Sequence, residues 1–349
     1  MRPSPFRIDR GNPLGTTAFA DILARYPRIG AAPVARKVVG GFSGGEVWRI
    51  DSEGASHALR RWPDGSRPSR VDEVHSVLTA LASRSGLPIA APLAARDGSR
   101  WTWWGGDIWE LTRWLPGEPP RSRTTNPALV AAAMRGLAAF HSAARGLTPP
   151  AFGESPSIVE RRGLARDGIA WNASTFERAV ATARDPQLAP RAERVRNAAP
   201  PWLPVVRADL DGAHAGPLHW ILRDVWRSNL LFEGERLSGW IDFDAMRIDS
   251  PSADIARLLG SLASDRPTWQ EGLSAYRESV ALGADDARRI LAFQRSGVLF
   301  SAINWLRWLV AERRTFDDRA AAIRRWDEWI GDLEAGPAAF AWIGDRAGW

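Results

Sequence analysis

Two acidic side chains and one amide follow a pair of apolar segments, Trp220–Leu222 and Leu237–Ile241. Asp224 comes just after the first segment and opens the sequence D-V-W-R-S-N, which Asn229 closes. Asp242 comes directly after the second segment. Carboxylate and amide oxygens are ligands that suit Mg²⁺, and phosphoryl transfer depends mostly on positioning and charge neutralisation. The spacing therefore indicates a magnesium and phosphate site at the ends of two strands.

Each polar residue of this stretch has a chemical role open to it. Asp224 can accept the proton of a substrate hydroxyl, and the carbonyl of Asn229 can ligate Mg²⁺ across the same loop. Asp242 can supply a second ligand, and Asp244 is either a further ligand or a turn acid. Arg227 either neutralises phosphoryl charge or is a solvated loop arginine. The alternative for the whole loop is a surface Asx turn.

The first third of the chain predicts a small antiparallel sheet with helices beside it. Apolar alternation between glycine-rich turns is typical of strands, and apolar residues at helical spacing indicate helices. Strands are expected over residues 34–39, 46–50, 57–62, 100–104 and 107–115, with one more short strand between residues 88 and 97. Helices are expected over Thr17–Tyr26 and Ser69–Ser85. The sequence L-P-G-E-P-P at 115–120 indicates a linker.

Beyond this linker the sequence predicts mostly helices, over residues 127–141, 157–184, 188–198, 253–264, 268–281, 285–313 and 317–333. Tryptophans recur on the last three of these helices, and their spacing is more typical of a core than of a stacking platform for a substrate. They are Trp269, Trp305, Trp308, Trp326 and Trp329. The pattern predicts an α+β chain with a sheet domain at 1–114, a linker at 115–120 and a helical domain at 121–349.

The composition argues against several function classes. The 349 residues include no cysteine, which excludes disulfides, thiolate zinc sites and a cysteine nucleophile and fits a reducing compartment. The N-terminal sequence has no signal-peptide core and no apolar run is long enough for a membrane helix, so we expect a cytoplasmic protein with no membrane partner. The net charge is +6, but the basic residues are dispersed, so we expect no nucleic-acid partner.

The segments I-L-R-D-V-W-R-S-N-L-L-F, G-W-I-D-F-D and D-S-P-S-A-D-I-A-R-L-L resemble the aminoglycoside phosphotransferase and choline kinase-like family, a branch of the protein-kinase-like fold. The family pattern is H-x-D-x-x-x-x-N, then I-D before an apolar residue, then P-x-x-D before an apolar residue. The resemblance implies a bilobal fold, with a small antiparallel-sheet N-lobe that binds nucleotide and a larger helical C-lobe with the catalytic loop and substrate site. It implies that Asp224 is the catalytic base, that Asn229 and Asp242 bind Mg²⁺, and that Asp254 structures the loop behind the site.

The resemblance also assigns ATP-binding residues in the N-terminal part. Gly41, Ser43 and Gly44, in G-G-F-S-G-G, would cover the phosphates, although a plain hairpin turn is the alternative. Arg60 stands where the family has a lysine, and an acid of the following helix, Glu73 or Asp72, would pair with it.

The segment E-L-T-R-W-L-P-G, with Thr112 and Trp114, resembles the hinge whose backbone would bind adenine. His141 matches a histidine common in the family, and a structural role is the other interpretation. The chain departs from the family pattern at Leu222, which replaces the first histidine, and at Arg60.

The sequence favours a small-molecule acceptor over a protein. Residues 243–253 are all that separate Asp242 from Asp254, which leaves no room for the long segment that presents a peptide in protein kinases. We therefore expect an ATP- and Mg²⁺-dependent phosphotransferase that acts on a hydroxyl of a small molecule. The alternative, which the two departures motivate, is a catalytically weak or inactive nucleotide-binding protein of the same fold. From Pro251 on, acids and bases nearly balance, so no strongly acidic substrate pocket is evident.

Overall fold

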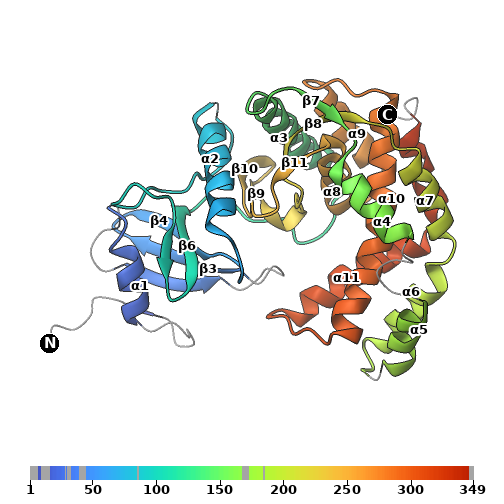
Figure 1. Ribbon diagram of the computed structural model, residues 1–349, viewed down its shortest axis with the longest axis horizontal. Coiled ribbons are helices and arrows are strands. Elements are labelled where there is room, and N and C mark those ends of the chain that lie inside the picture. Colours follow the sequence, from blue (N-terminus) through green and yellow to red (C-terminus); the bar gives the residue numbers. More distant parts are fainter. Residues whose placement is uncertain are drawn as a thin grey trace. The chain divides into compact units, whose positions relative to one another are not determined.

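The computed structural model describes residues 7–8, 16–27, 29, 33–38, 45–84, 86–166, 173–183 and 185–345 (Figure 1). By their contacts these residues form two compact units. The first contains the chain up to Glu118 together with Leu231–Asp244, and the second contains Pro119–Leu230 and the chain from Ala245 on. The expected α+β class is confirmed, with an antiparallel sheet in the N-terminal part and helices in the C-terminal part.

The first unit is built on a six-stranded sheet with the order β1-β2-β3-β4-β6-β5. All neighbouring strands are antiparallel except β1 and β2. Its strands are β1 (Arg7–Ile8), β2 (Val34–Val38), β3 (Glu46–Ser52), β4 (Ala55–Arg61), β5 (Thr102–Trp104) and β6 (Asp107–Arg113). The register sets Arg60 of β4 directly opposite Glu110 of β6, so the two side chains share one face of the sheet.

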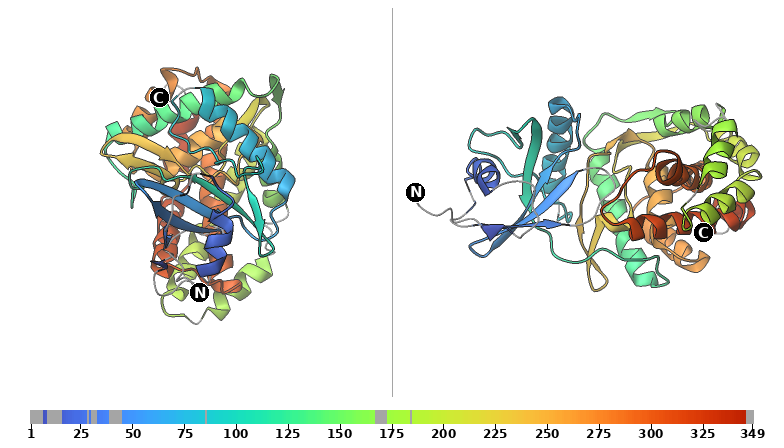
Figure 2. Two further views of the ribbon diagram at one scale, coloured as in Figure 1. Left: turned by 90° about the vertical axis from the view of Figure 1, so that its left-hand side faces the viewer. Right: turned by 90° about the horizontal axis from the view of Figure 1, so that it is seen from below.

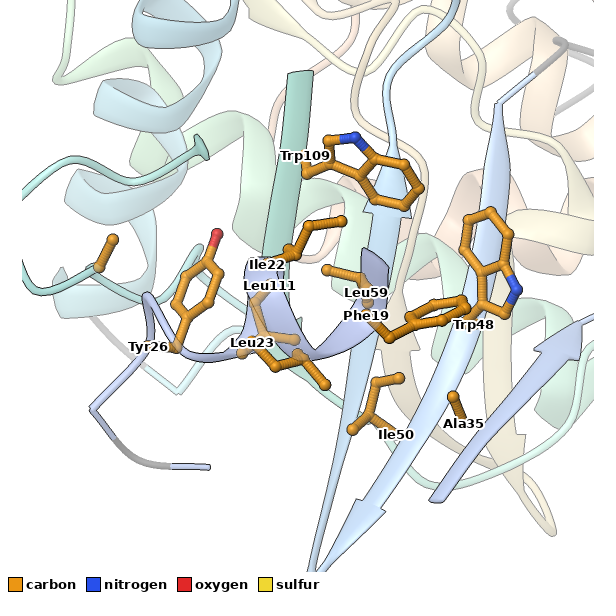
Figure 3. Packing of buried hydrophobic residues seen from close by; sticks show 11 residues of the cluster. Phe19, Ile22, Leu23, Tyr26, Ala35, Trp48, Ile50, Leu59, Trp109 and Leu111 are labelled. Atoms are coloured by element: carbon orange, nitrogen blue, oxygen red, sulfur yellow. The ribbon is translucent and has the colours of Figure 1, made fainter. Parts of the chain in front are cut away.

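A helix packs on each face of this sheet (Figure 2). Helix α1 (Thr16–Leu23) covers one face, where its apolar side chains and Tyr26 meet Trp48, Leu59 and Trp109 in a buried cluster (Figure 3). Because side chains alternate along a strand, Arg60 and Glu110 point to the opposite face. That face meets α2 (Pro68–Arg84), whose side chains therefore contact the polar residues of the sheet.

The first unit also includes a two-stranded hairpin, β9 (Leu230–Glu233) and β10 (Arg236–Trp240). It is attached to the segment after β6 by backbone hydrogen bonds between Glu118 and Phe232 and by a bond from Ser238 Oγ to the carbonyl of Pro116, at 2.6 Å. Gly117 lies between these contacts with φ of 99°, and a Cβ there would lie 2.6 Å from the Phe232 carbonyl oxygen. Asp242 and Asp244 lie shortly after β10 and belong to the first unit with the hairpin.

The second unit is mostly helical and contains the antiparallel sheet β7-β8-β11, with β7 (Ala151–Gly153), β8 (Gly216–Ile221) and β11 (Arg247–Asp249). Its helices are α3 (Pro127–Arg145), α4 (Pro156–Arg166), α5 (Ala173–Thr182), α6 (Ala189–Ala198), α7 (Trp202–Asp211), α8 (Pro251–Leu262), α9 (Arg266–Arg277), α10 (Ala284–Leu306) and α11 (Arg319–Glu334). Asn126 caps α3 by accepting from the backbone N–H groups of Ala128 and Leu129. Helix α10 packs against α7, α8 and α11, and α3 packs against α9.

Several local expectations differ from the structure. No strand forms between residues 88 and 97, where Ile89 makes a single bridge to Trp240. The two apolar segments beside Asp224 and Asp242 belong to different sheets, because β8 pairs with β7 and β11 whereas β10 pairs with β9. As expected, four of the five C-terminal tryptophans are buried in the core, and Trp308 is half-buried. Within the described part of the chain, no helix is long and apolar enough to cross a membrane.

Candidate active site

The loop after β8 carries Asp224, and one buried carboxylate fixes its backbone. Arg223 adopts a left-handed φ of 63°, which costs free energy in a residue with a side chain. The backbone N–H groups of Leu222 and Arg223 both donate to Asp254, each at 2.7 Å. Asp254 lies fully buried in the first turn of α8. These two charge-assisted hydrogen bonds hold the turn without any polar atom from the side chain at position 222.

Further buried polar groups hold Asp254 itself. His141 of α3 approaches Asp254 Oδ2 through Nε2 at 3.1 Å and the Tyr276 hydroxyl through Nδ1 at 2.7 Å. The ring of His219 lies 5.1 Å from that of His141, and burial, with the charge of His141 second, lowers the pKa of His219 to about 3. His141 thus supports the loop from behind, and this geometry favours the structural interpretation of that histidine.

The carboxylate of Asp224 is paired with Arg257 of α8. Arg257 Nη2 donates to Asp224 Oδ1 at 2.7 Å, and Oδ2 accepts no hydrogen bond from the residues that the structure describes. Partial burial would raise the pKa of Asp224, but the charge and hydrogen bond of Arg257, with Arg325 and Arg223 next, hold it below the ordinary value. Asp224 is therefore ionised at neutral pH, the state in which it can accept a proton.

Asn229 ends a short 3₁₀ turn, η1 (Arg227–Asn229), in the same loop. Its Nδ2 donates to the backbone carbonyl of Asp224 at 2.9 Å, which ties the two ends of the loop together. This bond leaves the amide oxygen Oδ1, whose one contact among the described residues is a long hydrogen bond of 3.4 Å from Ser228. Asn229 therefore offers an oxygen to a cation.

Arg227 is not a solvated loop arginine. It is buried, and its guanidinium donates to the Ser261 carbonyl at 2.8 Å and to Glu328 at 2.6 Å. Its backbone N–H donates to Ser261 Oγ at 3.1 Å. These contacts attach the loop to α8 and α11, so Arg227 has a structural role.

In the first unit, Arg60 lies among three carboxylates. Its Nη2 donates to Asp242 Oδ1 at 2.9 Å, both terminal nitrogens donate to Asp244, and Nη1 approaches Glu110 Oε1 at 3.5 Å. Burial alone would lower the pKa of Arg60, but the charges of Asp244, Asp242 and Glu110 raise it above the ordinary value. Asp242 has a left-handed φ of 66°, so this ion-pair network stabilises a strained turn.

Two more side chains contact the Glu110 carboxylate: Trp62, which directly follows β4, and His75 of α2. Trp62 Nε1 donates at 2.9 Å, and His75 Nε2 lies 2.5 Å from Glu110 Oε2. Burial would raise the pKa of Glu110, but the hydrogen bond from His75 and the charge of Arg60 lower it to about 2. The contact of α2 with the strand arginine thus runs from His75 through Glu110.

The expected helix acids have other partners. Glu73 pairs with Arg70 at 2.6 Å, one turn earlier on α2. Asp72 accepts from Trp101 Nε1 at 2.7 Å. Arg70 also reaches the backbone carbonyl of Asp244 at 3.1 Å, so α2 contacts the Asp242–Asp244 segment through a basic residue.

Two groups of expected nucleotide-binding residues remain. Gly41, Ser43 and Gly44 lie outside the described residues. Thr112 pairs with Ala58 in the sheet, and the backbone N–H of Trp114 donates to the Ser56 carbonyl at 2.9 Å. The guanidinium of Arg49 lies 5.0 Å from the centre of the Trp114 ring.

The oxygen donors fit Mg²⁺ better than a metal that needs a dedicated protein cage. Within the described residues, no group of three or more histidine, cysteine or acidic side chains could hold a metal ion. Mg²⁺ is commonly held by one or two protein oxygens and completed by phosphates and water. The Asn229 amide oxygen, in the second unit, and the Asp242 carboxylate, in the first, are each a ligand of the type that Mg²⁺ accepts.

The comparison with protein families gives the class of the protein, which is a phosphotransferase. The model of the phosphotransferase enzyme family, APH, matches residues 34–293, and the chain belongs to this family. No curated protein matches the chain in sequence. Membership therefore follows from the family model and not from any individual relative.

Solved structures share the fold at low sequence identity. Spectinomycin phosphotransferase in complex with ADP and spectinomycin superposes with a TM-score of 0.67 at 11% identity, over 94% of this chain and 100% of that one. A microcompartment-associated aminopropanol kinase gives 0.64 at 16% identity, over 95% and 99%. An amicoumacin kinase in complex with AMP-PNP and Ca²⁺ gives 0.58 at 13% identity, over 86% and 88%.

Proposed function

We propose that the protein transfers the γ-phosphoryl group of ATP to a hydroxyl of a small molecule in a Mg²⁺-dependent reaction. The observation that carries the proposal is the Asp224 loop: an ionised carboxylate with one free oxygen, on a turn that Asp254 holds from behind. Family membership supplies the phosphotransferase class. The relatives solved with ADP and with AMP-PNP and Ca²⁺ support a nucleotide and a divalent cation.

In this proposal Asp224 orients the acceptor hydroxyl and takes its proton. The acceptor oxygen forms a bond to the γ-phosphorus while the bond from that phosphorus to the bridging oxygen breaks, which gives ADP and a phosphate ester. Mg²⁺, when bound, neutralises charge on the phosphates. Asn229 and Asp242 would provide its protein oxygens.

The remaining assignments concern the nucleotide. Arg60 is proposed to contact the phosphates, because Arg keeps the positive charge of the lysine that it replaces but spreads it over a wider fork. Gly41, Ser43 and Gly44 are proposed to cover the phosphates. The backbone around Thr112 and Trp114 is proposed to meet the adenine through groups other than the Trp114 N–H, which donates to the Ser56 carbonyl. We withdraw the phosphate-neutralising role from Arg227, since its guanidinium is committed to Ser261 and Glu328.

The test is ATP binding by calorimetry, followed by ADP release across a library of hydroxyl-bearing metabolites and antibiotics. We expect Mg²⁺-dependent ATP binding that weakens in Asp242→Ala, and acceptor-dependent ADP release that is lost in Asp224→Asn. Absence of ATP binding contradicts the proposal. ATP binding with no acceptor-dependent turnover favours the alternative, a nucleotide-binding protein without kinase activity.

A further inference from the structure

Three guanidinium groups surround a single indole ring beside Asp224. The ring centre of Trp226 lies 5.2 Å from Arg227, 5.1 Å from Arg257 and 4.3 Å from Arg325, measured to each guanidinium carbon. We call these three arginines the arginine cluster. They come from the loop, from α8 and from α11, so three separate elements of the second unit bring positive charge to one place.

Two carboxylates lie against the arginine cluster. Arg227 pairs with Glu328 at 2.6 Å, and Arg257 pairs with Asp224 at 2.7 Å. Arg325 donates to the Ser228 hydroxyl at 3.2 Å. Burial, followed by the like charges of Arg257 and Arg227, lowers the pKa of Arg325 to about 9. Arg325 thus lies in a group of three arginines and two carboxylates, Asp224 and Glu328.

More cations lie on the side of Asp224 formed by α4 and β11. Arg223 and Arg247 share the carboxylate of Glu160, at 3.1 and 3.2 Å, and Arg247 also pairs with the buried Asp249 at 2.9 Å. Arg161 donates to the Phe293 carbonyl and to Ser296 Oγ, and burial, with the charge of Arg257 second, lowers its pKa to about 10. The acceptor side of the loop is therefore rich in arginine, which favours an anion there.

This charge is accessible. The side chains of Asp224, Arg223 and Arg257 are 44%, 39% and 33% exposed. Arg257 uses Nη2 on Asp224 Oδ1, and Asp224 Oδ2 is free within the described residues, as noted above. A molecule that brings a hydroxyl to Oδ2 therefore comes within reach of the Arg257 guanidinium, whose Nη1 makes no hydrogen bond to the described residues and can donate to a carboxylate or a phosphate.

We propose that the acceptor is a small hydroxyl-bearing anion, whose carboxylate or phosphate group binds Arg257 and Arg325 while its hydroxyl lies on Asp224 Oδ2. The proposal rests on the kinase function above and names the substrate class of that site. It predicts poor binding of polycationic acceptors such as aminoglycosides, because like charges that approach closely repel one another. The phosphorylated product would be more anionic than the acceptor by the added phosphate.

Calorimetry without nucleotide tests the anion site directly. The probes are two matched series that differ only in charge: glycerol, 3-amino-1,2-propanediol, glycerate and glycerol 3-phosphate, and then glucose, glucosamine, glucuronate and glucose 6-phosphate. We expect an anionic member of at least one series to bind about tenfold or more tightly than its neutral and cationic counterparts. The carboxylate and phosphate arms identify which oxyanion is preferred. Equal binding across both series, or no binding of any anion, overturns the proposal.

Variants then assign the binding to the arginine cluster. Arg257→Gln and Arg325→Gln should each weaken binding of the preferred anion about 10- to 100-fold, the range for a lost charge-assisted hydrogen bond. Arg257→Lys should recover part of the loss, and thermal unfolding shows whether each variant is folded. Arg135→Gln, which removes an exposed arginine paired with Glu278 just after α9, is the matched control and should bind as the parent does. Parent-like affinity in both cluster variants contradicts the proposal.

The two proposals fail in different ways. Anion binding without ADP release from ATP under any condition removes the kinase function and leaves the anion site standing. ADP release that depends on neutral or cationic acceptors, with no response to anionic ones, leaves the kinase function standing and removes the anion site.

Discussion

A single buried carboxylate, Glu110, links the strand arginine to the helix beside it. It lies opposite Arg60 in the register of β4 and β6 and receives hydrogen bonds from Trp62 and His75. Arg60 is thereby held between Glu110 on one side and Asp242 and Asp244 on the other. Removing any of these acids leaves a buried charge with less compensation, which is costly.

The pKa of Glu110 makes this link measurable. Its folded-state pKa, about 2, lies below the ordinary 4.5, so the unfolded chain takes up the proton first as the pH falls. The stability from this group is therefore complete above about pH 4.5 and decreases toward pH 2, by about 3 kcal/mol in total. Glu110→Gln should lose about that much at pH 7 and should show a flatter dependence between pH 2 and 4.5 in urea unfolding.

Glu278→Gln is the control for this experiment, because Glu278 forms an exposed ion pair with Arg135. Exposed pairs contribute little to stability, so this variant should follow the parent. If the curves of Glu110→Gln and the parent run parallel below pH 4.5, Glu110 does not carry the pH dependence.

Asp224→Asn tests the proposed base. Asn keeps the shape of Asp224 and can still accept from Arg257, so we expect little change in the free energy of unfolding. It cannot take a proton, so the rate of acceptor-dependent ADP release should fall about 10²- to 10⁴-fold. A variant that keeps the parent rate assigns the proton transfer to another group.

At this scale a single sequence can place two residues in one loop, but it does not identify their partners across the fold. The D-x-x-x-x-N pattern picked out Asp224 and Asn229, which share one loop. It did not reveal Glu110, because the residue opposite Arg60 depends on strand register, which a single sequence leaves open. Arg257 lies three residues after Asp254 in D-I-A-R, yet only the docking of α8 on the loop brings it to Asp224.

At the scale of elements, Gly117 controls how the β9–β10 hairpin attaches to the segment after β6. Its φ of 99° and the 2.6 Å distance from a built Cβ to the Phe232 carbonyl oxygen leave no space for a side chain. Gly98 has a similar φ of 84° with nothing within 4 Å of its Cβ position. A side chain at either position would therefore strain the backbone, but only a side chain at Gly117 would also clash with neighbouring atoms.

We therefore expect Gly98→Ala to cost about 1 kcal/mol, from backbone strain alone, and Gly117→Ala to cost about 3 kcal/mol or more. Urea unfolding of both variants and of the parent measures the two losses in the free energy of unfolding. Equal costs would show that the hairpin moves aside freely and that its attachment is not rigid.

The elements that the sequence identified are those with a strong period or clear turns. The helices at 69–85 and 127–141 and the strands at 46–50 and 57–62 correspond to α2, α3, β3 and β4. Short strands such as β7 and β11 have too few residues for a detectable alternation and form through pairing with β8. Helix α7 begins directly after Pro200 and Pro201, a position where proline is tolerated, so the two prolines mark the break from α6 and do not exclude a helix after it.

At the scale of the whole molecule, the proposed ligands of one Mg²⁺ are divided between the two units. Asn229 belongs to the second unit and Asp242 to the first. The sequence suggested a shared metal from the family pattern, and no contact within either unit bears on it. Independent evidence must come from coupling, because two residues that ligate one ion lose their effect together, whereas unrelated residues contribute additively.

The last prediction is therefore a double-mutant cycle on ATP affinity, measured by calorimetry with Mg²⁺ and with EDTA. Asn229→Ala and Asp242→Ala should each weaken binding with Mg²⁺, and the double variant should lose less than the sum, with a coupling of about 0.5 kcal/mol or more. Asp242→Ala also removes a partner of Arg60, so Asp244→Ala, which removes another, serves as the control. Its effect should add to that of Asn229→Ala. Coupling that persists in EDTA, or that is as large with Asp244→Ala, means that Arg60 and not a shared metal connects the two positions.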